Sequence, residues 1–153
     1  MLIKSAKLTL VLLVLSQAVL GLDFYNSEIE VVTDATRYRT LNPDVDLTQF
    51  EKVYVKGSFL FKAGEHITGD SLILRFTDEA QFTKASEVEV LLRYPEKGTN
   101  GNTITAIEIY VTASSEDADA WFTEGGINKS YAEILLECNK TVNFSYEIYI
   151  YGY

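Results

Sequence analysis

Cysteine, histidine and proline are scarce in this sequence. Its 153 residues include one cysteine, one histidine and two prolines. A chain whose only thiol is Cys138 has no internal disulfide framework, and a chain whose only imidazole is His66 has no histidine-rich metal site. Phosphate-binding loops and serine nucleophile elbows are also absent from the sequence. These absences argue against an enzyme, so we expect no catalytic residue, no metal and no cofactor, and we place His66 on the surface.

Positive charge is also in short supply. The chain has 13 lysines and arginines against 22 aspartates and glutamates, a net charge of −9. Removal of a leader that contains Lys4 and Lys7 leaves 11 basic against 22 acidic residues, or −11. Nucleic acids and anionic membranes recruit clusters of lysine and arginine. We therefore expect the partner to be a protein or a small molecule, with neither nucleic acid nor membrane as a partner.

One continuous hydrophobic run is present, and it lies near the N-terminus. Lys4 and Lys7 precede the apolar residues 8–15, and small residues follow. This order is typical of a secretory signal peptide, which we predict over residues 1–21. A membrane anchor is the alternative, but a spanning helix needs about 20 apolar residues, and this run is much shorter.

The small residues after the run offer two cleavage points. Cleavage is predicted after Ala18 or after Gly21. The mature protein is then expected to be secreted and extracellular. Its residues 22–153 show no linker or internal repeat, so we expect a single β domain.

What the sequence does have is aromatic residues in alternating patterns. Ten tyrosines and eight phenylalanines favour pleated, half-buried strands. In the last predicted strand the inward face carries Val142, Phe144, Tyr146, Ile148 and Ile150. Similar alternation predicts strands within residues 29–32, 53–61, 72–76, 87–92, 107–111 and 131–138. The sequence thus predicts an all-β, antiparallel sandwich or barrel of six to eight strands, with one short helix over 78–85 besides the signal-peptide helix.

Cys138 falls on the inward face of the predicted strand 131–138. A buried cysteine packs as a small hydrophobic residue. The alternative for a lone cysteine in a secreted chain is a disulfide between chains, which would make a homodimer through Cys138. Both alternatives remain open at this stage.

Three sites match the pattern for N-linked glycosylation. Asn128, Asn139 and Asn143 each precede a serine or threonine by two positions, without an intervening proline. Asn139 and Asn143 share the predicted outward face, as a glycan requires. The alternative is that they are unmodified surface asparagines.

The aromatic and acidic residues allow two further site hypotheses. Trp121 and Phe122 are expected to anchor the core, and the alternative is a ligand pocket formed by Trp121, Phe122, Phe144 and Tyr146. The acidic pairs near residues 28–30, 87–89 and 117–119 have the spacing of a solvated strand face. Residues 114–119 lack the ligand pattern of an EF-hand, so a solvated loop is expected rather than a calcium site.

From about residue 103 onward, the chain resembles the insect multiprotein bridging factor two (transcription activator) family of small secreted β-rich proteins. Three motifs carry the resemblance: Ile104-Thr105-Ala106-Ile107, Gly125-Gly126-Ile127 and Tyr149-Ile150-Tyr151-Gly152. Asn128 departs from the family, which usually has another glycine there. The resemblance implies no catalytic or ligand-binding residue.

Three functions follow as hypotheses. The first is a secreted, non-enzymatic protein that binds a protein or small ligand. The second is a transcriptional coactivator or bridging factor, as the name of the resembled family implies. The third is an extracellular carrier of a small ligand in an aromatic cavity.

Overall fold

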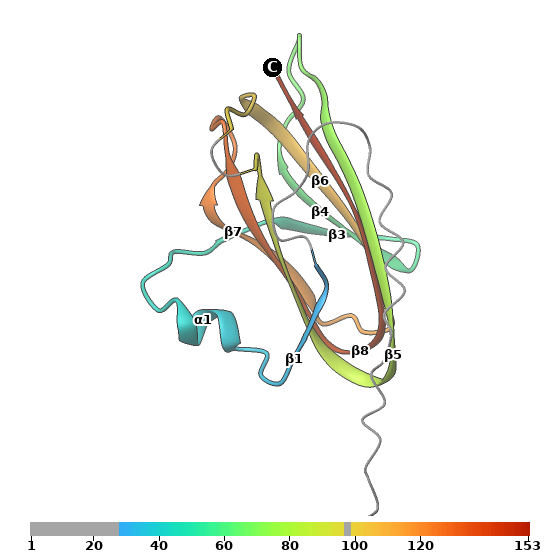
Figure 1. Cartoon of the computed structure of the whole chain (residues 1–153). Coiled ribbons are helices and arrows are strands. Elements are labelled where there is room, and N and C mark those ends of the chain that lie inside the picture. Colours follow the sequence, from blue (N-terminus) through green and yellow to red (C-terminus); the bar gives the residue numbers. More distant parts are fainter. Residues whose placement is uncertain (1–27, 97–98) are drawn as a thin grey trace, which may run out of the picture.

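The computed structural model describes residues 28–96 and 99–153 (Figure 1). The predicted signal peptide and both cleavage points lie outside the described residues. One short helix is observed, α1 (Arg37–Leu41). The eight strands of the described residues are β1 (Glu30–Val32), β2 (Thr48–Gln49), β3 (Glu51–Val55), β4 (Ser58–Gly64), β5 (Ser71–Tyr94), β6 (Ile104–Ala113), β7 (Ala118–Gly125) and β8 (Ala132–Gly152).

All strand pairs are antiparallel and belong to one sheet. The order along the sheet is β1-β5-β8-β6-β4-β3, and β7 pairs with both β8 and β2. The ends of this order do not meet, so the sheet does not close. The predicted all-β antiparallel fold with six to eight strands is confirmed, and of the two predicted architectures the barrel is not formed.

Two long strands divide the sheet into two layers. Both β5, with 24 residues, and β8, with 21, double back at one end of the molecule (Figure 1). The first layer contains β1, β2, β7, the second half of β5 and the first half of β8. The second layer contains β3, β4, β6, the first half of β5 and the second half of β8.

The bend has an identifiable local cause. Between paired residues, β5 inserts residues 82–85 opposite the single residue Val142 of β8. Lys140 of β8 adopts a φ of 53°. Extra residues on one strand of a ladder bend and twist both strands, and here they pass β5 and β8 from one layer to the other.

The core lies between the layers and follows the alternation of the strands. Even-numbered residues of β8 face inward on both sides of the bend at Lys140 and Val142, and buried side chains from β4, β5, β6 and β7 meet them. The largest fully buried side chains of the second layer are Phe61, Ile104, Ile107, Ile109, Phe144, Tyr146, Ile148 and Ile150. The apolar face predicted for residues 144–150 is therefore confirmed.

Two local predictions are wrong. Residues 78–85 are not a helix: Asp78 and Ala80 face inward in β5 and pair with Tyr146 and Phe144. Burial against β8 outweighs the helix preference of this segment, since propensity is a weak determinant beside tertiary packing. Val142 is 45% exposed instead of buried, because the bend at Lys140 interrupts the alternation just before it.

Candidate binding surface

The described part of the chain shows few features of an active site. Among those residues, no group of three or more His, Cys, Asp or Glu side chains is placed to hold a metal ion. No helix in the same ranges is long and apolar enough to cross a membrane. His66 is half exposed, as predicted, with Nδ1 3.2 Å from Asp70 Oδ2 and Nε2 3.6 Å from Glu108 Oε1.

The outer surface of the first layer carries a row of four carboxylates, which we call the acid row. Register places Glu30 of β1 beside Glu89 of β5, Glu89 beside Glu137 of β8, and Glu137 beside Asp119 of β7. Four acids on neighbouring strands repel one another. The fold therefore needs positive charge over this surface.

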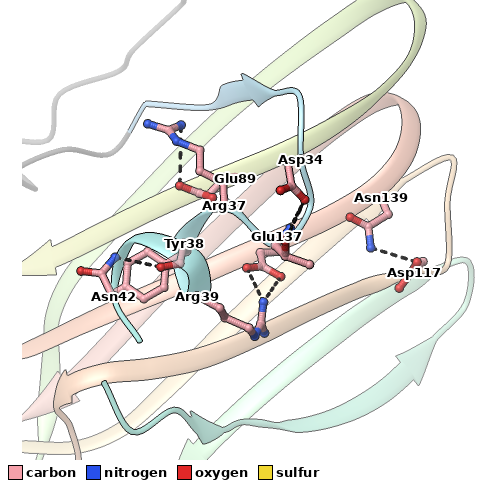
Figure 2. A network of polar contacts seen from close by, with 10 residues as sticks. Asp34, Arg37, Tyr38, Arg39, Asn42, Glu89, Asp117, Glu137 and Asn139 are labelled. Atoms are coloured by element: carbon pink, nitrogen blue, oxygen red, sulfur yellow. Dashed lines mark hydrogen bonds and ion pairs between the residues drawn. The ribbon is translucent and has the colours of Figure 1, made fainter. Parts of the chain in front are cut away.

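Helix α1 supplies that charge (Figure 2). Arg37 Nη1 lies 3.0 Å from Glu30 Oε2 and 3.9 Å from Glu89 Oε1. Arg39 Nη1 donates to both carboxylate oxygens of Glu137, at 2.9 and 3.0 Å, and its guanidinium lies 4.5 Å from the centre of the Trp121 ring. The arginines of α1 thus contact three of the four carboxylates of the acid row.

Burial under α1 changes the titration of the two middle acids. Burial raises the pKa of Glu137 above its usual range, although the hydrogen bond from Arg39 opposes the change. Burial likewise raises the pKa of Glu89, against the attraction of Arg37. The prediction that the 87–89 pair is fully solvated is wrong for Glu89, because α1 lies over it.

The outer surface of the second layer, by contrast, is open to solvent, and we call it the open face. It is formed by the outward residues of β3, β4, β6 and the second-layer halves of β5 and β8. Tyr110 lies at its centre and is 39% exposed. Its outward residues include Glu51, Val53, Leu60, Lys62, Arg75, Glu108, Tyr110, Glu147, Tyr149 and Tyr151.

Tyrosines on the open face contact one another in an ordered arrangement. The rings of Tyr149 and Tyr151 lie nearly parallel, with centres 6.5 Å apart. Tyr110 meets Tyr149 edge to face at 5.9 Å, and His66 meets Tyr151 edge to face at 4.2 Å. Such pairs hold the rings in place and add about 0.5–1.5 kcal/mol beyond burial. The result is a rigid aromatic surface that a partner can contact without ordering it first.

Cys138 has no exposed surface. Burial raises the pKa of its thiol to about 11. Both observations favour the buried-thiol alternative over a disulfide between chains, which requires an accessible sulfur.

The three predicted glycosylation sites differ in accessibility. Asn128 is exposed, in the turn between β7 and β8, with a φ of 65°. Asn139 is half-buried, and its Nδ2 donates to Asp117 Oδ2 at 3.0 Å (Figure 2). Asn143 is half-buried, and within the described ranges its Oδ1 is buried without a hydrogen-bond partner.

Of the four aromatic residues of the predicted pocket, three face the core and one faces outward. Phe144 and Tyr146 are fully buried in the core, where they contact each other at 6.1 Å. Phe122 packs against Phe50 at 4.3 Å. Trp121 faces outward beneath Arg39. Phe122 is therefore a core residue, as expected, and Phe144 and Tyr146 are core residues too. The core position expected for Trp121 is wrong, because its ring lies on the outer surface under Arg39.

The glycines of the resemblance motifs serve the turns. Gly125 and Gly126 have φ values of 65° and 123°, and a Cβ on Gly125 would lie 2.2 Å from the carbonyl oxygen of Tyr131. A Cβ on Gly152 would lie 2.0 Å from the carbonyl oxygen of Thr103. These motif residues fix backbone geometry and contribute no reactive group.

Sequence reasoning missed Arg37, Arg39 and Glu137. Each is an ordinary charged residue in its local sequence, and only the register of four strands brings their partners together. No local pattern marks them.

Comparison with known proteins gives one match. The family model described as Transcription activator MBF2 matches residues 63–152, more than half of the chain. No curated protein and no solved structure matches the chain. The matched region begins 40 residues before residue 103, the start of the resemblance noted in the sequence. It includes all of β5, β6, β7 and β8.

Proposed function

Because the chain belongs to the MBF2 transcription activator family, we propose that it is a protein-binding domain without catalytic activity. The observation that carries the proposal is the open face, with Tyr110, Tyr149 and Tyr151 held in contact with one another. Tyrosine is enriched in protein interfaces because it offers a large, rigid contact area together with a polar hydroxyl. The bridging role in the family name also requires protein partners.

The other large surface is a poorer candidate. On the first layer, Arg37 and Arg39 of α1 already pair with three of the four carboxylates of the acid row, Glu30, Glu89 and Glu137. A partner would have to displace these contacts before it could bind. The open face has ion pairs of its own, Arg75–Glu147 at 3.1 Å and Lys62–Glu51 at 3.9 Å. Its tyrosines, in contrast, are held by ring contacts that a partner can meet without breaking them.

We propose that the chain is a small secreted protein of insect type and that it binds its partner outside the cell. The support is the predicted leader over residues 1–21 and the exposed glycosylation site at Asn128. The competing hypothesis is a nuclear coactivator, and its support is the family name. The two hypotheses predict different locations for the protein, and one experiment distinguishes them.

The full chain should be produced in insect cells, and the protein in the medium should be analysed by mass and N-terminal sequencing. We expect a processed N-terminus at Val19 or Leu22 and a mass that falls on treatment with a glycosidase. Intact protein in the nucleus, with none in the medium, would contradict extracellular binding and favour the coactivator.

A second experiment tests the binding surface. The secreted protein and two variants should be used to capture partners from the fluid into which it is released. Tyr110→Asp places a charge at the centre of the open face, and Tyr131→Asp places one on an equally exposed tyrosine before β8. We expect Tyr110→Asp to lose a partner that Tyr131→Asp and the unmodified protein both retain. Equal capture by all three would overturn the assignment of the surface.

A further inference from the structure

We propose that the open face binds a second copy of this chain, with two domains packed face to face about a two-fold axis parallel to β6. The inference rests on the proposed function, because it names a partner for the same surface. It differs from a dimer through Cys138, which would need the buried sulfur.

The first observation is a row of five side chains that crosses the whole second layer. Register aligns Arg75 of β5, Tyr149 of β8, Glu108 of β6, Lys62 of β4 and Glu51 of β3. The row therefore alternates cation, aromatic ring, anion, cation and anion. Its terminal members, Arg75 and Glu51, have side chains 49% and 69% exposed.

The order of charges in this row is complementary to the same row of a second copy that runs in the opposite direction across the sheet. A two-fold axis along β6, the middle strand of the five, places Arg75 opposite Glu51 of the second copy, and Tyr149 opposite Lys62. The first contact is an ion pair, in which Arg75 exchanges Glu147 of its own chain, 3.1 Å away, for Glu51 of the second copy. Glu51 in turn leaves Lys62 of its own chain, 3.9 Å away, and the released Lys62 forms the second contact, a cation over an aromatic ring. Each contact occurs twice in a symmetric dimer.

The residues on the axis meet their own copies. Tyr110 lies on β6 beside Glu108, so the two Tyr110 rings meet, and aromatic pairs of this kind stabilise an interface. The two Glu108 carboxylates also meet, which is unfavourable by itself. His66 Nε2 lies 3.6 Å from Glu108 Oε1, so one imidazole stands beside each of these carboxylates.

The size of the open face suits such a dimer. Five strands about 4.8 Å apart give a width of about 24 Å, and about ten residues along β6 give a length of about 33 Å. Because β4 has seven residues and β3 only five, the area is roughly 700 Å² per copy, which is within the range of a standard interface. Sheets also pack face to face with their strands within about 30° of one another, as this axis requires.

The test is a charge exchange on the secreted protein, kept in a reducing agent so that Cys138 cannot form a disulfide. Sedimentation over a range of concentrations gives the monomer–dimer constant for the unmodified protein, Arg75→Glu, Glu51→Arg and the double variant. We expect each single variant to weaken dimerisation at least about tenfold, because like charges then face each other. The double variant restores the opposite charges and should recover the original constant.

Matched controls separate this contact from a change of net charge. Lys84→Glu, in the exposed bend of β5, changes the net charge as Arg75→Glu does, and Glu124→Arg, exposed on β7, matches Glu51→Arg. We expect both controls to dimerise like the unmodified protein. Circular dichroism of every variant verifies that the fold is intact.

Three outcomes would overturn the inference: a monomer at every concentration, a dimer that ignores both single variants, or controls that behave like the single variants. The proposed function survives these outcomes if a monomeric protein still captures a partner that Tyr110→Asp loses. It fails separately if Tyr110→Asp changes neither dimerisation nor capture.

Discussion

Arg39 in α1 donates two hydrogen bonds to Glu137 in β8, a residue 98 positions further along the chain. The Glu137 side chain is only 10% exposed, so Arg39 rather than solvent is the main partner of its charge. This contact fixes α1 over the first layer. Within residues 28–96 and 99–153, the outer surface of the second layer has no such helix over it.

Loss of the Arg39 side chain should destabilise the domain. Arg39→Ala leaves the Glu137 carboxylate buried without its partner, and we expect a cost of about 1–3 kcal/mol in the free energy of unfolding. Arg37→Ala is the control, since Arg37 and Glu30 are both well exposed, and such pairs contribute about 0.2–1 kcal/mol. Urea unfolding measures both. Equal effects would show that the acid row does not depend on Arg39.

Stability should rise as the solution is acidified through the folded pKa values of the buried acids toward about pH 4. Burial raises the pKa values of Asp78, Glu89 and Glu137. The folded state therefore holds these protons more tightly than the unfolded chain. Their contribution is complete below the unfolded pKa values of about 4 and is lost as the pH rises through the folded values. Glu137→Gln should flatten the measured dependence, and an unchanged slope would contradict it.

Further acidification should reverse the trend. The backbone hydrogen bond from Thr36 lowers the pKa of Asp34, and the Thr105 hydroxyl lowers that of Asp70. Groups with a lowered pKa stabilise the fold above the unfolded pKa and lose this contribution as the pH falls through the folded value. We therefore expect a stability maximum near about pH 4–5 in thermal melts. A stability that falls steadily from pH 7 would contradict this expectation.

Cys138 should resist alkylation in the folded protein. Its sulfur is fully buried, and its thiol pKa is raised to about 11, so little reactive thiolate is present near neutral pH. Iodoacetamide followed by mass spectrometry should label the thiol only in denaturant. Rapid labelling of the native protein, or a dimer that is lost on reduction, would favour the accessible alternative.

Glycan occupancy should decrease from Asn128 to Asn143. Asn128 lies in an exposed turn, whereas Asn143 is half-buried in β8. The test compares three single variants by mass spectrometry of the secreted protein: Asn128→Gln, Asn139→Gln and Asn143→Gln. We expect Asn128→Gln to remove one glycan from nearly every molecule and Asn143→Gln to leave the mass distribution almost unchanged. The reverse order would mean that the sugar is attached before β8 takes its final place.

Gly125 should be replaceable only at a large cost in stability. Gly57 and Gly125 both have positive φ, but a Cβ on Gly57 meets nothing within 4 Å, whereas one on Gly125 meets the Tyr131 carbonyl oxygen at 2.2 Å. Gly57→Ala should cost about 1–2 kcal/mol from backbone strain alone. Gly125→Ala should cost clearly more, because the turn before β8 must also move. Thermal unfolding of the two variants compares them directly.

Much of β8 was predictable because alternation is a local property. The inward positions from Phe144 to Ile150 and the burial of Cys138 follow from a period of two residues. Val142 departs from that pattern because Lys140 bends the strand. The segment 78–85 contains residues that favour a helix, and it forms a strand because Asp78 and Ala80 pair with β8. Its partner lies more than 60 residues away, beyond the range of any local pattern.

The sequence by itself determined an acidic, aromatic, all-β chain with its strands in alternating order, because these features depend on composition and on neighbouring residues. Only the tertiary structure decided which surface is closed and which is open. Glu30, Glu89, Glu137 and Asp119 form one row because register aligns four strands, and α1 must then cover it with Arg37 and Arg39. The tyrosines of the second layer have no such cover from α1, so they remain available for a partner.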